Sequence, residues 1–161
     1  MTRQPPAPAP ELDAEFVAGL RTMFEEKIVF NRLLGLKIVT LRPDKVVGRI
    51  AMRPDLVGHY GYNRLHGGVV SAGLDAMAGL AVMAALGARH PEEPPEQRLQ
   101  RFAKLGTIDL RVDYLRPAIG TQFELHAEVL RLGSRVASTR MEFLGADGKL
   151  LSLGGGAYIV S

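Results

Sequence analysis

The spacing of apolar residues changes along this chain and predicts, in order, a helix, two strands, a second helix and a run of further strands. Within residues 11–28 apolar side chains recur at helical spacing, with acidic residues on the other face, which predicts an amphipathic helix covering an edge or mouth of the fold. Its apolar positions are Leu12, Phe16, Leu20, Met23 and Phe24. Residues 36–41 and 45–52 are strand-like runs separated by the turn sequence Arg42-Pro43-Asp44, and residues 54–62 are predicted to form a loop.

An apolar segment with almost no charge follows and predicts one long central helix. Asp75 is the only formally charged residue between Arg64 and Arg89, and the segment is apolar on every face. Such a helix must be enclosed, either by a membrane or by the rest of the fold. Residues 67–88 are long enough to span a bilayer, but they contain more Gly and Ala than Leu and Ile, and they carry a carboxylate midway. We therefore expect a helix enclosed by a sheet, and no membrane insertion.

The C-terminal third alternates apolar and polar residues with the period of two that is typical of half-buried strands. A loop over residues 87–95, with three prolines, and a short basic helix over residues 96–104 precede it. The predicted strands cover residues 108–114, 123–129, 137–143 and 150–160. Because short turns join the last three, we expect an antiparallel meander. The fold class is α+β, with an antiparallel sheet wrapped around one long central helix.

Two details of these strands can be checked against a structure. In the first strand the alternation places Ile108, Leu110, Val112 and Tyr114 on the buried face. In the last strand Gly154-Gly155-Gly156 indicates either a bulge or a close approach of the helix backbone.

The composition is that of an ordinary globular protein and excludes several kinds of site. Hydrophobic residues make up 47% of 161 residues, and the net charge of +3 is only mildly basic. The sequence has no cysteine, which excludes disulfides, thiolate metal sites and a cysteine nucleophile, and which suits a cytoplasmic protein. Residues 1–10 form a flexible, proline-rich N-terminus without the apolar core of a signal peptide, and residues 11–161 form a single domain. Aromatic residues are not interleaved with basic ones, so we expect no nucleic-acid partner.

The start of the central helix combines the elements of a reactive site. Burial of an unpaired carboxylate costs several kcal/mol, so Asp75 in an apolar helix indicates a functional group. The turn His66-Gly67-Gly68 precedes the helix, where backbone N–H groups and the positive end of the helix dipole are free to bind a developing negative charge. Alternatives remain for both residues. Asp75 is either functional or a structural acid that pairs with Arg64 or caps a helix elsewhere, and His66 either orients the reacting groups or only hydrogen-bonds the backbone of its own turn.

At these residues the chain resembles the hotdog-fold acyl-CoA thioesterases, in particular the phenylacetate-pathway-thioesterase-like subfamily. The family motif is a His-Gly-Gly turn with an acidic residue nine positions after the His, here His66 and Asp75. Residues 106–118 resemble the following strand of the family, with Thr107 near the catalytic acid and a Tyr-x-x-Pro corner that begins at Tyr114. The turn Gly133-Ser134-Arg135 is similar to a hairpin that contacts coenzyme A. The resemblance covers residues 30–161 in the expected order.

This resemblance implies a hotdog domain over residues 11–161 that hydrolyses an acyl-CoA thioester to a carboxylic acid and free CoA. Asp75 would act as general base or nucleophile, Thr107 would hydrogen-bond the water or the carboxylate, and Gly67 and Gly68 would form the oxyanion site. The implied substrate-binding residues are Tyr114, Arg131, Gly133, Ser134 and Arg135. No metal and no cofactor are implied, since coenzyme A is part of the substrate.

One departure from the family keeps an alternative open. Related enzymes place an Asn six residues before the His, a position occupied here by Tyr60. Asn63, three residues before His66, either takes that role or the role is absent. The alternative is therefore a catalytically weak acyl-CoA-binding or regulatory hotdog protein.

The spacing along the helix indicates that two chains build the site. Gly67 and Asp75 are eight residues apart, which corresponds to ~12 Å along a helix. Reacting groups must lie within ~3.5 Å of a common centre, so one chain cannot easily present both to one carbonyl. A two-fold homodimer with antiparallel helices can, and hotdog proteins are dimers with sites at that interface. A homotetramer, as a dimer of dimers, is left open.

The other polar residues favour structural interpretations. Arg98, Arg101 and Lys104 are predicted to form a solvated helix face rather than to bind the phosphates of coenzyme A, whereas Arg131 and Arg135 beside a glycine turn are better phosphate candidates. His59, His90 and His126 lack metal-ligand spacing and are expected at the surface.

Overall fold

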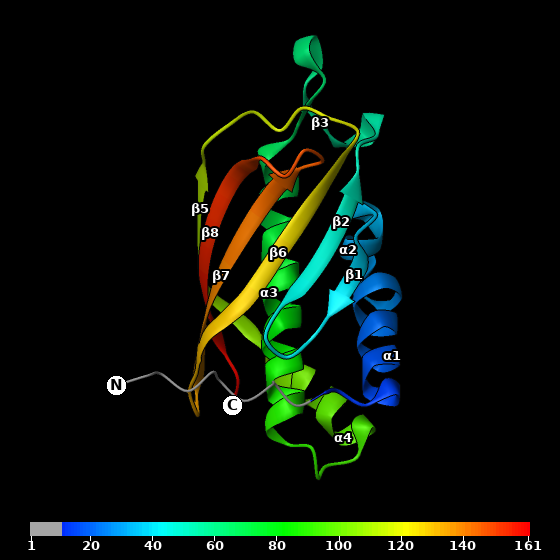
Figure 1. Ribbon diagram of the computed structural model, residues 1–161, viewed down its shortest axis with the longest axis vertical. Helices are drawn as coiled ribbons and strands as arrows, with labels where there is room; N and C mark the ends of the chain where they lie inside the picture. Colours follow the sequence, from blue (N-terminus) through cyan, green and yellow to red (C-terminus); the bar gives the residue numbers. More distant parts are fainter. Residues whose placement is uncertain (1–10) are drawn as a thin grey trace, which may run out of the picture.

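A computed structural model describes residues 11–161, and the predicted N-terminal segment of residues 1–10 lies outside the described residues. A six-stranded sheet wraps around the helix α3 (Gly67–Arg89), as Figure 1 shows. The strands are β1 (Lys37–Leu41), β2 (Val46–Ala51), β5 (Gly106–Tyr114), β6 (Gln122–Leu132), β7 (Val136–Gly145) and β8 (Leu150–Ile159). Their order in the sheet is β1-β2-β6-β7-β8-β5, and each neighbouring pair is antiparallel. The predicted α+β hotdog architecture is confirmed.

The central helix is enclosed by protein, as its composition predicts. It is long and apolar enough to cross a membrane, but 72% of its most apolar 18-residue window is buried inside the fold. Leu74, Met77, Leu80 and Met83 are fully buried and face the sheet and the N-terminal helices. The apolar surface that made a membrane segment conceivable is therefore the centre of the hydrophobic core.

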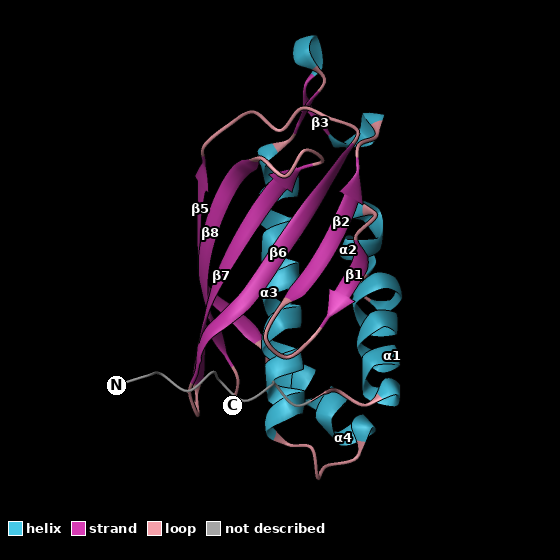
Figure 2. Cartoon of the chain, viewed as in Figure 1, coloured by secondary structure: helices cyan, strands magenta, loops and turns pink. Residues whose placement is uncertain are grey.

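The N-terminal region is helical over a longer stretch than the sequence predicts. Asp13 caps α1 (Ala14–Thr22), a π-helical turn (Met23–Lys27) follows, and α2 (Val29–Leu34) ends at Gly35, whose φ of 70° is left-handed. The amphipathic pattern does not continue after residue 28, because several apolar side chains of α2 do not point into the core but are exposed. These are Val29, Phe30 and Leu33. In Figures 1 and 2 these helices lie beside the β1 edge and next to α3.

Two predicted loops contain more regular structure than expected. Residues 54–62 include a 3₁₀ turn (Pro54–Leu56), the short strand β3 (Val57–His59) and a second 3₁₀ turn (Tyr60–Tyr62), and β3 pairs with β4 (Arg64–Leu65). The predicted loop over residues 87–95 is wrong at its start, because α3 continues through Arg89. The first proline of that segment is Pro91, so nothing in the sequence stops the helix earlier.

Two predictions about the strands are wrong, for reasons of tertiary context. Ile108 and Tyr114 are 57% and 54% exposed, because β5 is an edge strand with β8 as its single neighbour and because Ile108 is the extra residue of a bulge. Gly154-Gly155-Gly156 contains no bulge, since its register with β7 is unbroken. Gly154 instead leaves room for side chains: an added Cβ would lie 3.2 Å from Met141 Cε and 3.4 Å from Leu74 Cδ1.

Arg98 is the largest departure from the sequence prediction. It lies on α4 (Pro95–Gln100), which a 3₁₀ turn (Arg101–Lys104) follows, and it is 4% exposed rather than solvated. Its guanidinium forms an ion pair with Asp13 and lies 4.5 Å from the centroid of the Phe16 ring. Arg98 therefore connects the start of α1 to α4 and is part of the core.

Candidate active site

Asp75 lies midway along α3 and is held by two hydroxyl groups. Thr107 Oγ1 and the Tyr158 hydroxyl both donate to Asp75 Oδ1, at 2.9 Å and 2.8 Å. Thr107 on β5 and Tyr158 on β8 are register partners, so two neighbouring strands bring both donors to one carboxylate. Among residues 11–161 no cation lies within ion-pair distance of Asp75, and the alternative in which it pairs with Arg64 is wrong.

Tyr158 is a residue that the sequence analysis did not select. Its side chain is 1% exposed, and burial, followed by the nearby Asp75 charge, raises the pKa of its phenol well above the usual range. The phenol therefore stays protonated and remains a hydrogen-bond donor. The one hint in the sequence is Gly156, two residues earlier on the same face of the strand. In the structure the Tyr158 ring occupies the space that a side chain there would need, since an added Cβ on Gly156 would lie 3.0 Å from the ring.

The Asp75 carboxylate opens onto a mainly apolar cavity of about 350 Å³. Its walls come from the N-terminal helices, α3, the turn after α4, and strands β5 and β8. The apolar lining includes Phe24, Ile28, Phe30, Phe102 and Leu105. Phe24 and Phe102 contact each other edge to face, with ring centroids 5.7 Å apart. A cavity with one charged group at its wall and aromatic residues beyond it suits a ligand with a reactive polar end and an apolar body.

His66 caps the start of α3, and one of the two glycine amides expected to be free is therefore already hydrogen-bonded. His66 Nδ1 accepts a hydrogen bond from the Gly68 N–H at 2.8 Å. The expectation that both glycine amides are free is therefore wrong for Gly68. The Gly67 N–H has no acceptor among the residues that the structure describes, so this amide remains available at the positive end of the helix. Of the two interpretations of His66, the structure supports backbone hydrogen bonding.

Tyr114 and Asn63 lie near this end of α3 rather than near Asp75. The Tyr114 hydroxyl donates to the Gly67 carbonyl at 2.9 Å. Tyr114 also lines, with Arg64 and Arg116, a cavity of about 380 Å³ beside the helix N-terminus. Asn63 is exposed and has a left-handed φ of 46°, a conformation that Asn tolerates better than most residues. The left-handed backbone at this position is thus a structural reason for an asparagine here.

The predicted coenzyme A-contacting residues lie at the opposite end of α3. Arg131, Gly133, Ser134 and Arg135 belong to the β6–β7 hairpin or flank it. Arg89, the last residue of α3, donates to the carbonyls of Leu132 and Gly133 and so fixes this hairpin at the C-terminal end of the helix. One chain therefore keeps three groups apart: the Gly67 amide, the Asp75 carboxylate and the hairpin.

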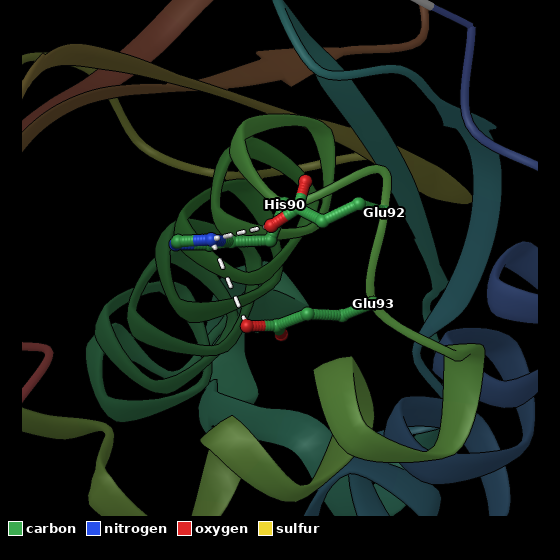
Figure 3. A group of neighbouring side chains, drawn as sticks. All are labelled: His90, Glu92 and Glu93. Carbon is green, nitrogen blue, oxygen red and sulfur yellow. Dashed lines mark ion pairs between the residues drawn. The ribbon is translucent and has the colours of Figure 1, made fainter.

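One cluster of possible metal-ligating side chains occurs in the described part of the chain. In Figure 3 the side chains of Glu92 and Glu93 approach His90 in the loop after α3, and His90 Nδ1 lies 3.5 Å and 3.7 Å from their carboxylate oxygens. Arg101 hydrogen-bonds the Glu93 carboxylate and is the main cause that holds its pKa below the usual range. Because Glu93 is already paired with Arg101, the cluster is explained by polar contacts between the loop after α3 and the 3₁₀ turn after α4.

Comparisons with known proteins agree with this architecture. The sequence model of the thioesterase superfamily matches residues 62–152. The medium/long-chain acyl-CoA thioesterase YigI of Salmonella typhimurium is 37% identical over 140 residues, covering 86% of this chain and 89% of that protein, and the Escherichia coli protein of the same name is 36% identical over 140 residues. A crystal structure from Shewanella oneidensis, described as related to the thioesterase superfamily, is 39% identical with a TM-score of 0.86, and the match covers 92% of this chain and 97% of that one. The chain thus belongs to the thioesterase superfamily and is a thioester hydrolase of the hotdog fold.

Proposed function

We propose that this protein hydrolyses acyl-CoA thioesters with apolar acyl chains of medium to long length, and that Asp75 is its catalytic carboxylate. The observation that carries the proposal is the Asp75 carboxylate, held by Thr107 and Tyr158 at the wall of an apolar cavity. The relatives named medium/long-chain acyl-CoA thioesterases support the substrate class. The aromatic and aliphatic lining of the cavity supports an acyl chain over a polar or charged group.

The reaction adds water across the thioester and needs no further reactant. As a general base, Asp75 takes a proton from water while the water oxygen attacks the carbonyl carbon; as a nucleophile, its carboxylate attacks first and water hydrolyses the resulting anhydride. In both routes the carbonyl oxygen becomes an oxyanion, which the Gly67 N–H can stabilise. In the general-base route the carbon–sulfur bond then breaks, and the thiolate of coenzyme A takes the proton that Asp75 removed from water. In the nucleophile route this bond breaks as the anhydride forms, and the thiolate takes its proton from the water that hydrolyses the anhydride. The products of both routes are the carboxylic acid and the free thiol of coenzyme A. No metal or redox cofactor takes part in this reaction.

We place the complete site between two copies of the chain, as a homodimer. The Gly67 amide and Asp75 are separated by ~12 Å along α3, and one face of this half of the helix is incompletely buried. The open positions are Gly68, Ser71, Ala72, Asp75 and Ala76. The edge strand β5, which has a free side, lies next to this face. A two-fold arrangement of antiparallel helices pairs the Gly67 amide of one chain with Asp75 of the other.

The remaining predicted residues take roles within this dimer. Tyr114 orients the Gly67 turn through the Gly67 carbonyl. Arg131 and Arg135 bind the phosphates of coenzyme A, and Gly133 and Ser134 let the hairpin approach it. The cysteine-free sequence fits a reducing compartment, and we propose the cytoplasm.

The test is thiol release from a panel of acyl-CoAs, from short to long and including one aromatic acyl group, with wild type and Asp75→Asn. This substitution keeps the size of the side chain and removes its charge. We expect saturable hydrolysis that favours medium and long chains and falls about 1,000-fold or more in the variant, the loss of about 4 kcal/mol of transition-state stabilisation. Asp44→Asn, in the exposed turn between β1 and β2, is the matched control and should be fully active.

Two results would contradict the proposal. If wild type binds acyl-CoA tightly but releases no thiol, the chain is the catalytically weak binding protein that the missing upstream Asn leaves open. If Asp75→Asn is as active as wild type, the carboxylate does not act in the reaction.

A further inference from the structure

The Asp75 carboxylate is held through one of its two oxygens. Thr107 Oγ1 and the Tyr158 hydroxyl both donate to Oδ1, at 2.9 Å and 2.8 Å, and the Tyr158 hydroxyl also lies 3.3 Å from the Asp75 backbone carbonyl oxygen. Within residues 11–161 no side chain donates to Oδ2. The two oxygens of this carboxylate are therefore chemically different.

The fold gives Tyr158 little freedom to move. The residue is 1% exposed, it lies opposite Thr107 in the β5–β8 register, and its ring fills the space above Gly156. A hydroxyl on a rigid aromatic ring in a strand is a better anchor than one on a loop, because packing fixes both of its side-chain torsions. The Asp75 side chain is thus fixed from the sheet, although it belongs to the helix.

We propose that Tyr158 is a positioning residue for the hydrolysis: with Thr107 it fixes the Asp75 carboxylate through Oδ1, so that Oδ2 is the oxygen that reacts. This inference rests on the proposed function. Two hydrogen bonds spread the negative charge of Oδ1 and occupy its lone pairs, whereas those of Oδ2 stay free to take a proton from water or to attack the carbonyl carbon. In this role Tyr158 acts through Asp75, to which its hydroxyl donates.

The surroundings of Asp75 favour a Tyr158 hydroxyl that keeps its proton and donates it to the carboxylate in a hydrogen bond, rather than one that transfers this proton. Asp75 is the one charged residue that lines the cavity, and Tyr158 is the other titratable group there. Burial and the adjacent carboxylate raise the pKa of Tyr158, which keeps the proton on the phenol. The Tyr158 hydroxyl therefore remains a hydrogen-bond donor to Asp75.

The experiment compares the steady-state kinetics of wild type, Tyr158→Phe and Thr139→Val on one long-chain acyl-CoA. Tyr158→Phe removes the hydroxyl and keeps the ring, and we expect kcat to fall about 10- to 100-fold while KM changes little. Thr139→Val is the matched control, because Thr139 is also buried in the sheet but donates to the Gly156 carbonyl, not to Asp75. It should lower the melting temperature to a similar extent and leave kcat unchanged.

A second comparison shows whether Tyr158 acts through Asp75. In the background of Asp75→Asn, Tyr158→Phe should have no further effect on residual turnover, since the group that it positions is gone. If Tyr158→Phe does not fold, Gly156→Ala is the alternative, because its Cβ would lie 3.0 Å from the Tyr158 ring, and 3.3 Å from the Asp109 carbonyl oxygen and Thr139 Oγ1, which forces a small shift of the ring. It should also lower kcat more than it raises KM.

The outcomes separate this inference from the proposed function. Full activity of Tyr158→Phe together with an inactive Asp75→Asn overturns the positioning role and leaves the function intact. If Tyr158→Phe lowers kcat by the same factor in wild type and in Asp75→Asn, the positioning role is also overturned, because Tyr158 then acts independently of the Asp75 carboxylate. A wild-type protein that hydrolyses no acyl-CoA overturns the proposed function and this inference with it.

Discussion

The two halves of α3 have similar small and apolar residues but differ in how they are covered. Between Gly67 and Ala76 one face of the helix is open, and Asp75 lies on it. From Met77 to Gly87 every residue except Ala85 is buried. Small residues thus have different surroundings in one helix: in the first half they leave one face open beside Asp75, and in the second half they let neighbouring elements pack closely. The first half carries the carboxylate that we propose to be catalytic, and the second half contributes the centre of the hydrophobic core.

The largest expected effect is a loss of stability on substitution of Phe16, which packs against the enclosed half of α3. Phe16 is fully buried on α1, so Phe16→Ala should destabilise the fold by about 3–5 kcal/mol through lost burial and a cavity. In a chain of this size that lowers the melting temperature by about 10 °C or more. Thermal unfolding followed by circular dichroism measures it, and kcat at a temperature where the variant is folded should be retained.

The same substitution on the open side provides the control. Phe30 on α2 is 55% exposed and lines the cavity beside Asp75. Phe30→Ala should change stability by less than about 0.5 kcal/mol and weaken the binding of acyl-CoA instead. Equal losses of melting temperature in both variants would show that the two halves are equally covered in solution, and the comparison would fail.

A pair of glycine substitutions within α3 should give effects of opposite sign. A Cβ on Gly87 would lie 2.1 Å from Phe16 Cε1, whereas a Cβ on Gly79 would lie 3.6 Å from Leu105 Cδ2, which is ordinary contact. Gly87→Ala should therefore destabilise by about 1–3 kcal/mol through overpacking. Gly79→Ala should stabilise by up to about 1 kcal/mol, because alanine is the better helix former. Denaturant unfolding of both variants measures this difference, and a stabilised Gly87→Ala would show that α1 can shift away from α3.

The central helix and the carboxylate on it could be predicted from the sequence, whereas the different coverage of its two halves could not. The uncharged run predicts an enclosed helix, and the spacing from His66 to Asp75 places a turn and a carboxylate on it, because helical period and composition are local properties. The resemblance also predicts that Thr107 lies near Asp75, and the hydrogen bond between them agrees. These features depend on one segment, or on a motif that a family repeats.

What the sequence did not predict depends on contacts between distant segments. Tyr158 reaches Asp75 across 83 positions, and a bulge at Ile108 sets which β5 residue, Thr107, lies opposite Tyr158. A slip of one residue would turn Thr107 or Tyr158 to the other face of the sheet. Arg98 was predicted to be solvated for the same reason: its partner Asp13 is 85 positions away, and no local pattern indicates that pairing.

A smaller effect, on specificity rather than stability, is expected where the enclosed half of α3 borders the cavity beside Asp75. Gly79 lines the cavity beside Phe24 and Phe102, so the methyl group of Gly79→Ala narrows it. A change of one methylene in an apolar pocket changes discrimination by about 1–3 kcal/mol, and the added methyl lies at the low end of that range because its contacts are loose. We expect kcat/KM to fall about 10-fold for the longest acyl-CoA that wild type accepts, with little change for short chains. A uniform loss across chain lengths would show that the acyl group lies elsewhere.

The smallest expected effect on stability comes from the charge of Asp13, whose ion pair with Arg98 links α1 to α4 beside the enclosed half of α3. Asp13 caps α1 through the Phe16 N–H at 2.9 Å and forms an ion pair with the buried Arg98, and these two contacts, in that order, lower the pKa of Asp13. A carboxyl whose pKa is lower in the folded state stabilises the fold above its unfolded pKa of about 4 and loses that contribution as pH falls through the folded value. Because 45% of the Asp13 side chain is exposed, solvent screening keeps the contribution below about 1 kcal/mol.

Asp13→Asn tests this contribution, since asparagine keeps the helix cap and removes the charge. At pH 7 the variant should be less stable than wild type by that small amount, and the two unfolding curves should converge as the pH is lowered below about 4. A difference that does not change with pH would mean that the ion pair contributes nothing. Arg98 would then stabilise the enclosed half through its stacking on Phe16 and its place in the core. In that case the contact between α1 and α4 that covers the enclosed half would depend on packing and not on the charge of Asp13.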